Sequence, residues 1–142
     1  MRPHLVIDTW GWITLLNKQE PRHETVSAYY TDARSKGKTI YTTDYILDET
    51  FTLLFRRLPF PLAGKAMSFI NDAVDNGYLL VEWVTPERFK AAKALRLQYK
   101  DKPKISFTDI TTMVIMKELS MTHILTDDDR FQQAGMGFKI LK

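Results

Sequence analysis

Acidic residues at four separate places in this sequence either end a short apolar run or open a helical pattern. Asp8 closes LVID, Glu49 lies in ILDETF, Asp109 lies in SFTDI, and residues 127–129 are three consecutive aspartates after ILT. A carboxylate in apolar surroundings is costly unless its charge is compensated. Two carboxylates about 5 Å apart repel by roughly 3 kcal/mol at an effective dielectric constant of about 20. If these four positions meet in the fold, we therefore expect a cation to balance them.

The other residue types indicate which cation such a site would hold. Cysteine is absent, and the three histidines are His4, His23 and His123. Thiolate zinc sites, disulfides and cysteine nucleophiles are thereby excluded. A set of oxygen ligands suits Mg²⁺ or Mn²⁺ better than zinc. Such an ion can activate water and stabilise the charge of a phosphodiester under attack.

Each acidic position also has a simpler structural explanation. Asp109 completes a capping box with Ser106, Asp8 satisfies an amide of the next turn, Glu49 is an ordinary helix residue, and residues 127–129 cap a short helix. For any one position alone this explanation stays open. It is weaker for all four together, because all of them stand in apolar sequence.

Short β-rich runs alternate with longer helical patterns along the chain. This alternation predicts a single α/β domain, residues 1–142, with a mostly parallel sheet covered on both faces. Ligands of such sheets bind beyond the carboxyl ends of the strands, where all four acidic positions are expected. We predict strands at 4–8, 39–42, 79–84, 122–126 and 137–141, and helices near 22–36, 44–57, 61–76, 86–99 and 106–119.

Basic residues gather in one segment of the chain. Residues 86–104 hold seven basic and two acidic side chains, whereas the rest of the chain is slightly acidic. Lys93, Arg96 and Lys100 share one stripe of the predicted helix, which suits an RNA backbone or is only a solvated face. No long apolar segment follows the N-terminal basic residue, so we expect a cytoplasmic protein without a membrane partner.

Together the acidic motifs resemble those of a PIN-domain ribonuclease, and most closely the VapC-like toxins of toxin–antitoxin pairs. The motifs are Asp8 after a hydrophobic strand, Glu49 in LDET, Asp109 in SFTD, and LTDDDRFQQAG near the C-terminus. The resemblance implies a three-layer α/β/α fold with a five-stranded sheet of order 3-2-1-4-5. It further implies an acidic pocket that holds Mg²⁺ or Mn²⁺ and cleaves RNA endonucleolytically.

The resemblance also assigns roles to single residues. In the family pattern the last acid stands three positions before an aromatic residue, which selects Asp128, three before Phe131. If a helix begins just after Thr126, Asp128 and Phe131 share one face of it. Asp127 remains the alternative ligand, because both neighbours of Asp128 are acidic here, unlike the family pattern. The implied ligands are Asp8, Glu49, Asp109 and Asp128, and Thr9, Ser106 and Thr126 are supporting residues.

Similar proteins form homodimers and are inhibited by a cognate antitoxin, which lies over the pocket. We therefore expect an RNA substrate, an antitoxin partner and a homodimer. Aromatic residues could line the antitoxin groove, although aromatics at helical spacing usually pack in the core. The candidates are Trp10, Trp12, Phe51, Phe55 and Phe60.

Three other functions compete with this interpretation. A PIN-domain nuclease of RNA processing, unrelated to toxins, would carry the same acids. A receiver domain that accepts a phosphoryl group is also α/β, but it pairs two acids at the end of the first strand, where this chain has Asp8 alone. A nucleic-acid binding module without catalysis would not need all four acidic positions. Phosphate-loop, dinucleotide-binding and nucleophile-elbow motifs are absent from the sequence.

Overall fold

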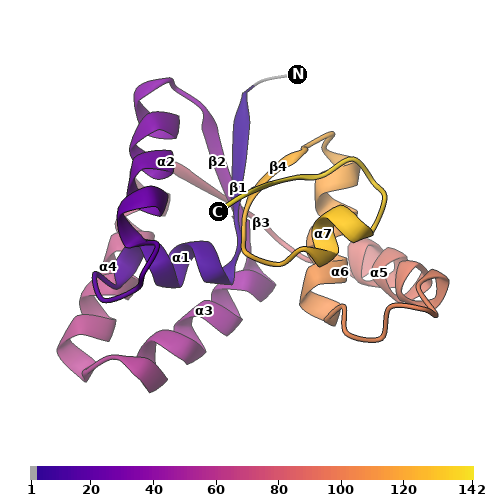
Figure 1. The fold of residues 1–142 in the computed structure, drawn as a ribbon, viewed down its shortest axis with the longest axis horizontal. Helices are drawn as coiled ribbons and strands as arrows, with labels where there is room; N and C mark the ends of the chain where they lie inside the picture. The colour runs from indigo at the N-terminus through magenta and orange to yellow at the C-terminus, as the bar shows by residue number, and fades with distance from the viewer. Residues whose placement is uncertain (1–2) are drawn as a thin grey trace.

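A five-stranded parallel sheet forms the centre of the protein, as the computed structural model shows for residues 3–142 (Figure 1). All four strand pairs are parallel, and the strand order is β3-β2-β1-β4-β5. The predicted α/β fold and its strand order are therefore confirmed. The strands are β1 (His4–Ile7), β2 (Thr39–Thr43), β3 (Leu79–Glu82), β4 (His123–Leu125) and β5 (Lys139–Leu141).

The helices connect these strands, and five of them match the predicted helical segments. Helix α1 was not predicted, and α7 is a single turn before the last strand. Within residues 3–142, none of the helices has the length and apolar character needed to span a membrane. The helices are α1 (Thr9–Leu16), α2 (His23–Ser35), α3 (Asp44–Arg57), α4 (Phe60–Asp75), α5 (Pro86–Gln98), α6 (Phe107–Glu118) and α7 (Arg130–Gln133).

The sheet separates two cores because successive strand residues point to opposite faces. Leu5 and Ile7 of β1 pack with α1 to α4, whereas Val6 packs with α5, α6 and Phe131. Figure 1 shows the same division, with α1 to α4 on one side of the sheet and α5 to α7 on the other. The result is the three-layer arrangement that the resemblance implied.

The carboxyl ends of β1 and β4 meet at the centre of the sheet. Ile7 and Leu125 are register partners, and the amide of Asp8 donates to the carbonyl of Leu125 at 3.1 Å. Helix α1 begins one residue later and lies unusually close to the sheet. A Cβ atom on Gly11 would stand 2.8 Å from the Leu125 carbonyl oxygen, so this contact admits only glycine. The start of α1 is thereby fixed beside the end of β4.

The segment just after Thr126 is not helical, so the condition under which Asp128 and Phe131 would share one helix face is not met. Helix α7 begins at Arg130, with Asp129 at its N-cap position. The aspartates instead form a turn, in which the amide of Asp128 donates to the Thr126 hydroxyl at 3.1 Å. Side-chain acceptors of this kind compete with helix formation in the first residues. Phe131 nevertheless points inward and is fully buried, as expected.

Candidate active site

Asp8 lies at the junction of β1 and α1, with 7% of its surface exposed. The hydroxyl of Thr126 donates to its carboxylate at 2.9 Å, so the residue that ends β4 orients the acid that ends β1. The pKa of Asp8 is raised to about 6, mainly by burial; the negative charges of Glu49 and Asp128 also raise it, and two hydrogen bonds lower it. The Asp8 carboxylate is thus desolvated and faces other acids.

Asp109 lies in the first turn of α6 and is also buried. It forms the predicted capping box: its amide donates to the Ser106 hydroxyl at 3.0 Å, and its carboxylate accepts from the Ser106 amide at 3.3 Å. Burial raises the pKa of Asp109 well above its usual range, and the charges of Asp8 and Asp128 raise it further. Asp109 therefore both caps helix α6 and lies among the acids of the site.

Asp128 is the member of the aspartate triplet that faces the other two acids. Its charge acts on both Asp8 and Asp109, and its side chain is 19% exposed. One cation already lies beside it, because the Arg130 guanidinium contacts its carboxylate at 3.3 Å. The amide of Arg130 also donates to the same carboxylate at 3.0 Å. Arg130 thus partly neutralises Asp128 in this arrangement.

The other two aspartates of the triplet are exposed. Asp129 forms an ion pair with Lys142 at 3.2 Å. Burial raises the pKa of Asp127, and the acids that act on it are Asp128 and Asp129 rather than Asp8 or Asp109. Of the three side chains, Asp128 is therefore the one that the structure turns toward the buried acids.

Glu49 reaches the site from α3, where it is exposed. It shares one helix face with Leu53 and Arg57, and all three line the same cavity. Thr9 connects the two helices at this point: its hydroxyl donates to the Ile46 carbonyl and accepts from Thr50, both at 3.4 Å. The Thr9 hydroxyl therefore holds α1 against α3, whereas the Thr9 backbone forms a hydrogen bond with the Asp8 carboxylate.

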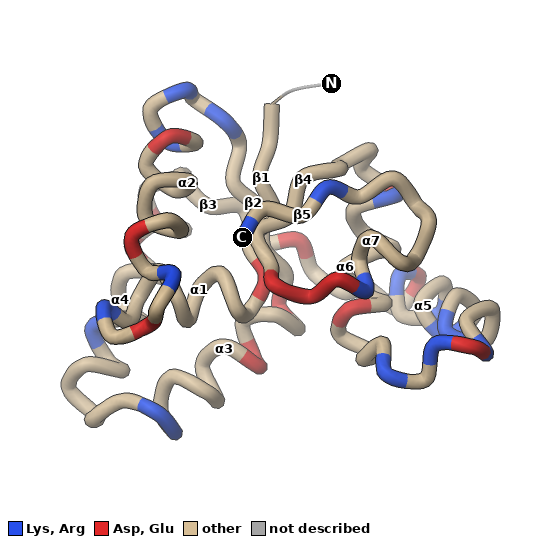
Figure 2. Tube along the Cα trace, viewed as in Figure 1, with Lys and Arg blue, Asp and Glu red and all other residues tan. Residues whose placement is uncertain are grey.

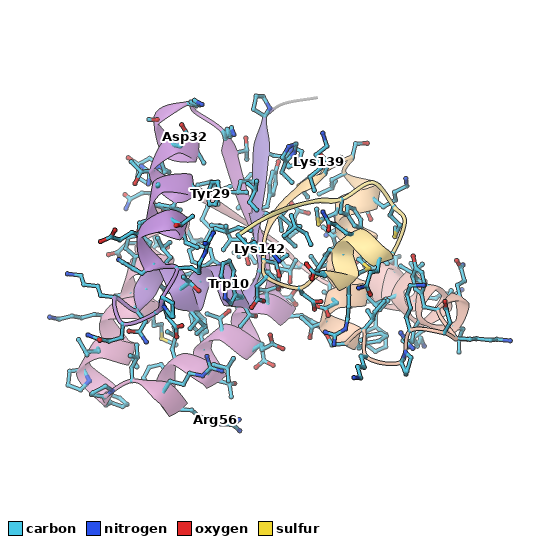
Figure 3. All side chains as sticks on the ribbon, viewed as in Figure 1. Trp10, Tyr29, Asp32, Arg56, Lys139 and Lys142 are labelled. Carbon is cyan, nitrogen blue, oxygen red and sulfur yellow. The ribbon has the colours of Figure 1, made fainter. Side chains whose placement is uncertain are left out.

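These residues surround one cavity of about 320 Å³. Figure 2 shows acidic segments of distant parts of the chain around the region where β1 and β4 end. Trp10 of α1 lies near the centre of the molecule in the same view (Figure 3). The lining includes the four predicted ligands together with Thr9, Ser106, Thr126 and Asp127.

A metal ion fits this donor set chemically. Among residues 3–142, no three Asp, Glu or His side chains converge closely enough in this arrangement to hold an ion. The acids nevertheless offer only oxygen atoms, and burial and mutual repulsion destabilise the charges of Asp8 and Asp109. A hard divalent cation would relieve both effects, which suits Mg²⁺ or Mn²⁺.

The three predicted RNA-binding residues lie outside the lining of this cavity. Lys93 and Arg96 belong to α5, whereas Lys100 follows the end of this helix at Gln98. Lys93 and Lys100 are exposed. Arg96 is partly buried and donates from Nη2 to the carbonyls of Tyr99 and Lys102, both at 3.2 Å. Its guanidinium therefore holds the loop after α5.

Three other cations line the acidic cavity, although the sequence pattern did not single them out. They are Arg57, Lys104 and Arg130. A signal for Arg57 was its spacing of eight residues from Glu49, which places both on one face of a helix. Arg130 stands two residues after Asp128, and Lys104 stands two residues before Ser106.

The predicted groove aromatics divide between core and surface. Trp12 is fully buried and donates from Nε1 to the Thr42 hydroxyl at 3.1 Å, so it belongs to the core. Phe51 and Phe55 are partly buried against the core. Phe60 is 77% exposed and contacts Phe55 in a tilted arrangement, with 5.3 Å between ring centroids. Of this set, Trp10 alone lines the acidic cavity.

The parallel sheet of order 3-2-1-4-5, with acids at its carboxyl edge, is the arrangement that the resemblance to PIN domains implied. No protein-family model matches the chain. It is similar to VapC20 of Mycobacterium tuberculosis, described as a 23S rRNA-specific endonuclease, with 28% identity over 92% of this chain and 94% of the relative. It is also similar to a VapC ribonuclease of Archaeoglobus fulgidus, with 27% identity over 93% of this chain and 81% of the relative.

Solved structures agree with these sequence relatives. The crystal structure of M. tuberculosis VapC20, a toxin that cleaves the sarcin–ricin loop, matches with a TM-score of 0.76 and 28% identity over 92% of this chain and 95% of the other. VapBC2 of Rickettsia felis, bound to a promoter DNA fragment, matches in fold with a TM-score of 0.71 at 13% identity over 97% of both chains. The resemblance to VapC-like PIN-domain toxins is thus confirmed.

Proposed function

We propose that this protein is a metal-dependent endoribonuclease and the toxin of a VapBC-like toxin–antitoxin pair that acts in the cytoplasm. One observation carries the proposal: four acids from separate parts of the chain line a single cavity at the carboxyl edge of a parallel sheet. The relatives add the substrate class, because one is described as an endonuclease of 23S rRNA and another as a VapC ribonuclease.

In this proposal Asp8, Glu49, Asp109 and Asp128 hold Mg²⁺ or Mn²⁺. When bound, such an ion supplies an activated water molecule and stabilises the charge of the attacked phosphodiester. The protein's own contribution is to orient the acids before RNA arrives.

Hydroxyl and amide groups provide this orientation. The Thr126 hydroxyl directs the Asp8 carboxylate, and the capping box with Ser106 fixes Asp109 at the start of α6. Both are positioning residues because they act through the acids. Burial of the acids strengthens their interaction with any ion, since the local dielectric constant is lower than that of water.

The direct test is RNA cleavage by the purified protein in Mg²⁺ or Mn²⁺ and in EDTA. Glu49→Gln keeps the shape of the side chain, removes its charge and should abolish most of the cleavage. Asp48→Asn is the matched control, because Asp48 is the adjacent exposed acid of α3 and lies outside the lining of the cavity. Discrete cleavage by the wild type and by Asp48→Asn, with loss in Glu49→Gln and in EDTA, is the expected result. Equal cleavage by both variants would contradict the proposal.

An antitoxin partner and a homodimer belong to the same proposal. Solved structures of similar fold include VapBC2 of R. felis and FitAcB of Neisseria gonorrhoeae, the latter with a TM-score of 0.65 at 13% identity over 97% of this chain and 96% of the other.

Expression of the wild type should arrest growth, whereas Glu49→Gln should not. Unimpaired growth with an active wild-type enzyme would instead support a PIN-domain nuclease of RNA processing. Light scattering of the purified protein should give twice the mass of one chain.

A further inference from the structure

Two cavities meet beside the acids. The acidic cavity shares part of its lining with a second, larger cavity of about 640 Å³. The shared residues are Asp127 and Asp128 with the two cations Lys104 and Arg130. These two cations therefore lie where the two cavities adjoin. We call Lys104 and Arg130 the junction cations.

The junction cations are available to a ligand. Lys104 is exposed and forms no ion pair with an acidic group of residues 3–142. The neighbouring Lys102, by contrast, is already paired with Asp101 at 3.0 Å. The side chain of Arg130 is 38% exposed, and its contacts with Asp128, at 3.3 and 3.4 Å, are long for charge-assisted hydrogen bonds. The Arg130 guanidinium can thus exchange Asp128 for a better placed anion.

The outer wall of the second cavity is held in place by hydrogen bonds from inside the protein. Arg96 binds the carbonyls of Tyr99 and Lys102, and its Nη1 atom is buried without a hydrogen-bond partner among residues 3–142. The Tyr99 hydroxyl donates to the Ala134 carbonyl at 2.9 Å, just after α7. The loop that carries Lys104 is therefore tied both to α5 and to the segment that carries Arg130.

We propose that Lys104 and Arg130 form a phosphate-binding subsite that holds the RNA backbone next to the bond to be cleaved. This inference rests on the proposed nuclease function of the acidic cavity. In it Arg96, which the sequence placed on an RNA-binding stripe, is a positioning residue that acts through the loop of Tyr99 and Lys102.

The charges around the acidic cavity explain why the subsite would bind one phosphate of a longer strand rather than a free phosphate. The acidic cavity repels any anion that approaches without a cation, so a single phosphate gains little there. A polyanionic strand can place one phosphate at the acids with their ion and the next phosphate between Lys104 and Arg130. As Arg130 turns to this phosphate it releases Asp128, whose charge then becomes available to the metal ion. RNA and metal should therefore each favour binding of the other.

Binding of a fluorescein-labelled, unstructured 12-nucleotide RNA, measured by anisotropy in EDTA, tests the subsite without cleavage. The double variant Lys104→Gln/Arg130→Gln should bind at least about tenfold more weakly. The slope of log K against log salt should fall by about 1.4, because two single-strand phosphate contacts are lost. Arg130→Lys, which keeps the charge, should recover part of the affinity.

Two control variants remove the same amount of charge elsewhere. Arg56→Gln/Lys139→Gln neutralises two exposed cations at the end of α3 and on β5, which lie far apart in Figure 3 and outside both linings. Lys93→Gln/Lys100→Gln, the α5 variant, neutralises two exposed lysines on and just after α5. Both should keep the wild-type slope within about 0.4. Equal losses in all three double variants, or a loss only in the α5 variant, would overturn the subsite.

A second readout separates this inference from the nuclease proposal. Without RNA, Arg130→Gln should bind Mn²⁺ about threefold or more tightly than the wild type in calorimetry, because the internal partner of Asp128 is gone. Unchanged or weaker Mn²⁺ binding would overturn the exchange of partners at Asp128. If the subsite is wrong but the nuclease is real, Glu49→Gln still loses cleavage while the junction variant binds RNA normally. If the nuclease proposal itself is wrong, the wild type does not cleave RNA, or Glu49→Gln cleaves it as fast as the wild type.

Discussion

Removal of the Asp8 charge should stabilise the metal-free protein. Burial raises the pKa of this carboxyl from 3.8 to about 6, so its charged form is less stable in the folded than in the unfolded chain. The difference of about 2 pKa units corresponds to roughly 3 kcal/mol at pH 7.5. Because an asparagine side chain at this position can still accept the Thr126 hydroxyl, Asp8→Asn should gain about 2–3 kcal/mol in EDTA. The melting temperature should rise by roughly 6–12 °C.

The pH dependence of stability is an independent check on the sign of this effect. Because the pKa of the Asp8 carboxyl is higher in the folded than in the unfolded chain, its contribution to stability is fully present below the pKa of the unfolded chain. This contribution is lost as the pH rises through the pKa of the folded chain. The advantage of Asp8→Asn should therefore shrink to about half at pH 5. Thermal melts of the wild type and Asp8→Asn at pH 5 and 7.5 measure this difference in stability. Asp48→Asn, which removes an exposed charge, is the control. An Asp8→Asn variant that is no more stable than the wild type at pH 7.5 in EDTA would refute the reasoning.

Three further predictions concern metal, the triplet and the fold. Mn²⁺ at about 100 times its dissociation constant should stabilise the wild type by roughly 2.7 kcal/mol in thermal melts, and equal melting temperatures with Mn²⁺ and EDTA would count against a metal site. Asp128→Asn should slow RNA cleavage at least about 100-fold, but Asp127→Asn and Asp129→Asn each less than about tenfold; the reverse order would move the ligand along the triplet. Gly11→Ala should destabilise the fold by about 1–3 kcal/mol in urea titrations, because its Cβ meets the Leu125 carbonyl; an unchanged midpoint would show that α1 can shift.

The sequence predicted the sheet and most helices because their signals are local. Alternation of apolar strands and helices indicates a parallel sheet, and the spacing of Ser106 and Asp109 indicates the start of α6. Helix α1 was missed because TWGWITLL holds aromatic and β-branched residues and a glycine, which have low helix propensity. Five of its residues are buried, so it also lacks the polar face by which a surface helix is recognised.

The acids were predictable as a group, whereas the cations around them were not. Carboxyl ends of parallel strands share one edge, so Asp8 and the aspartates after β4 had to be neighbours. Lys104 lies in the loop after α5, and Arg130 opens the single turn α7 after the aspartates. Neither position is marked by a periodic pattern in the sequence. No helix begins just after Thr126, because the side chains there bind the backbone of the turn.

The rate of Mn²⁺-dependent RNA cleavage by Asp109→Asn, compared with the wild type, tests the nuclease centre most directly. Asp109 is buried beside Asp8 and Asp128, and an asparagine can still accept the Ser106 amide and preserve the start of α6. With circular dichroism and melting temperature at least equal to those of the wild type, cleavage should fall at least about 100-fold, or about 2.7 kcal/mol in barrier. Cleavage by a well-folded Asp109→Asn variant at the wild-type rate would contradict a nuclease centre built on these acids.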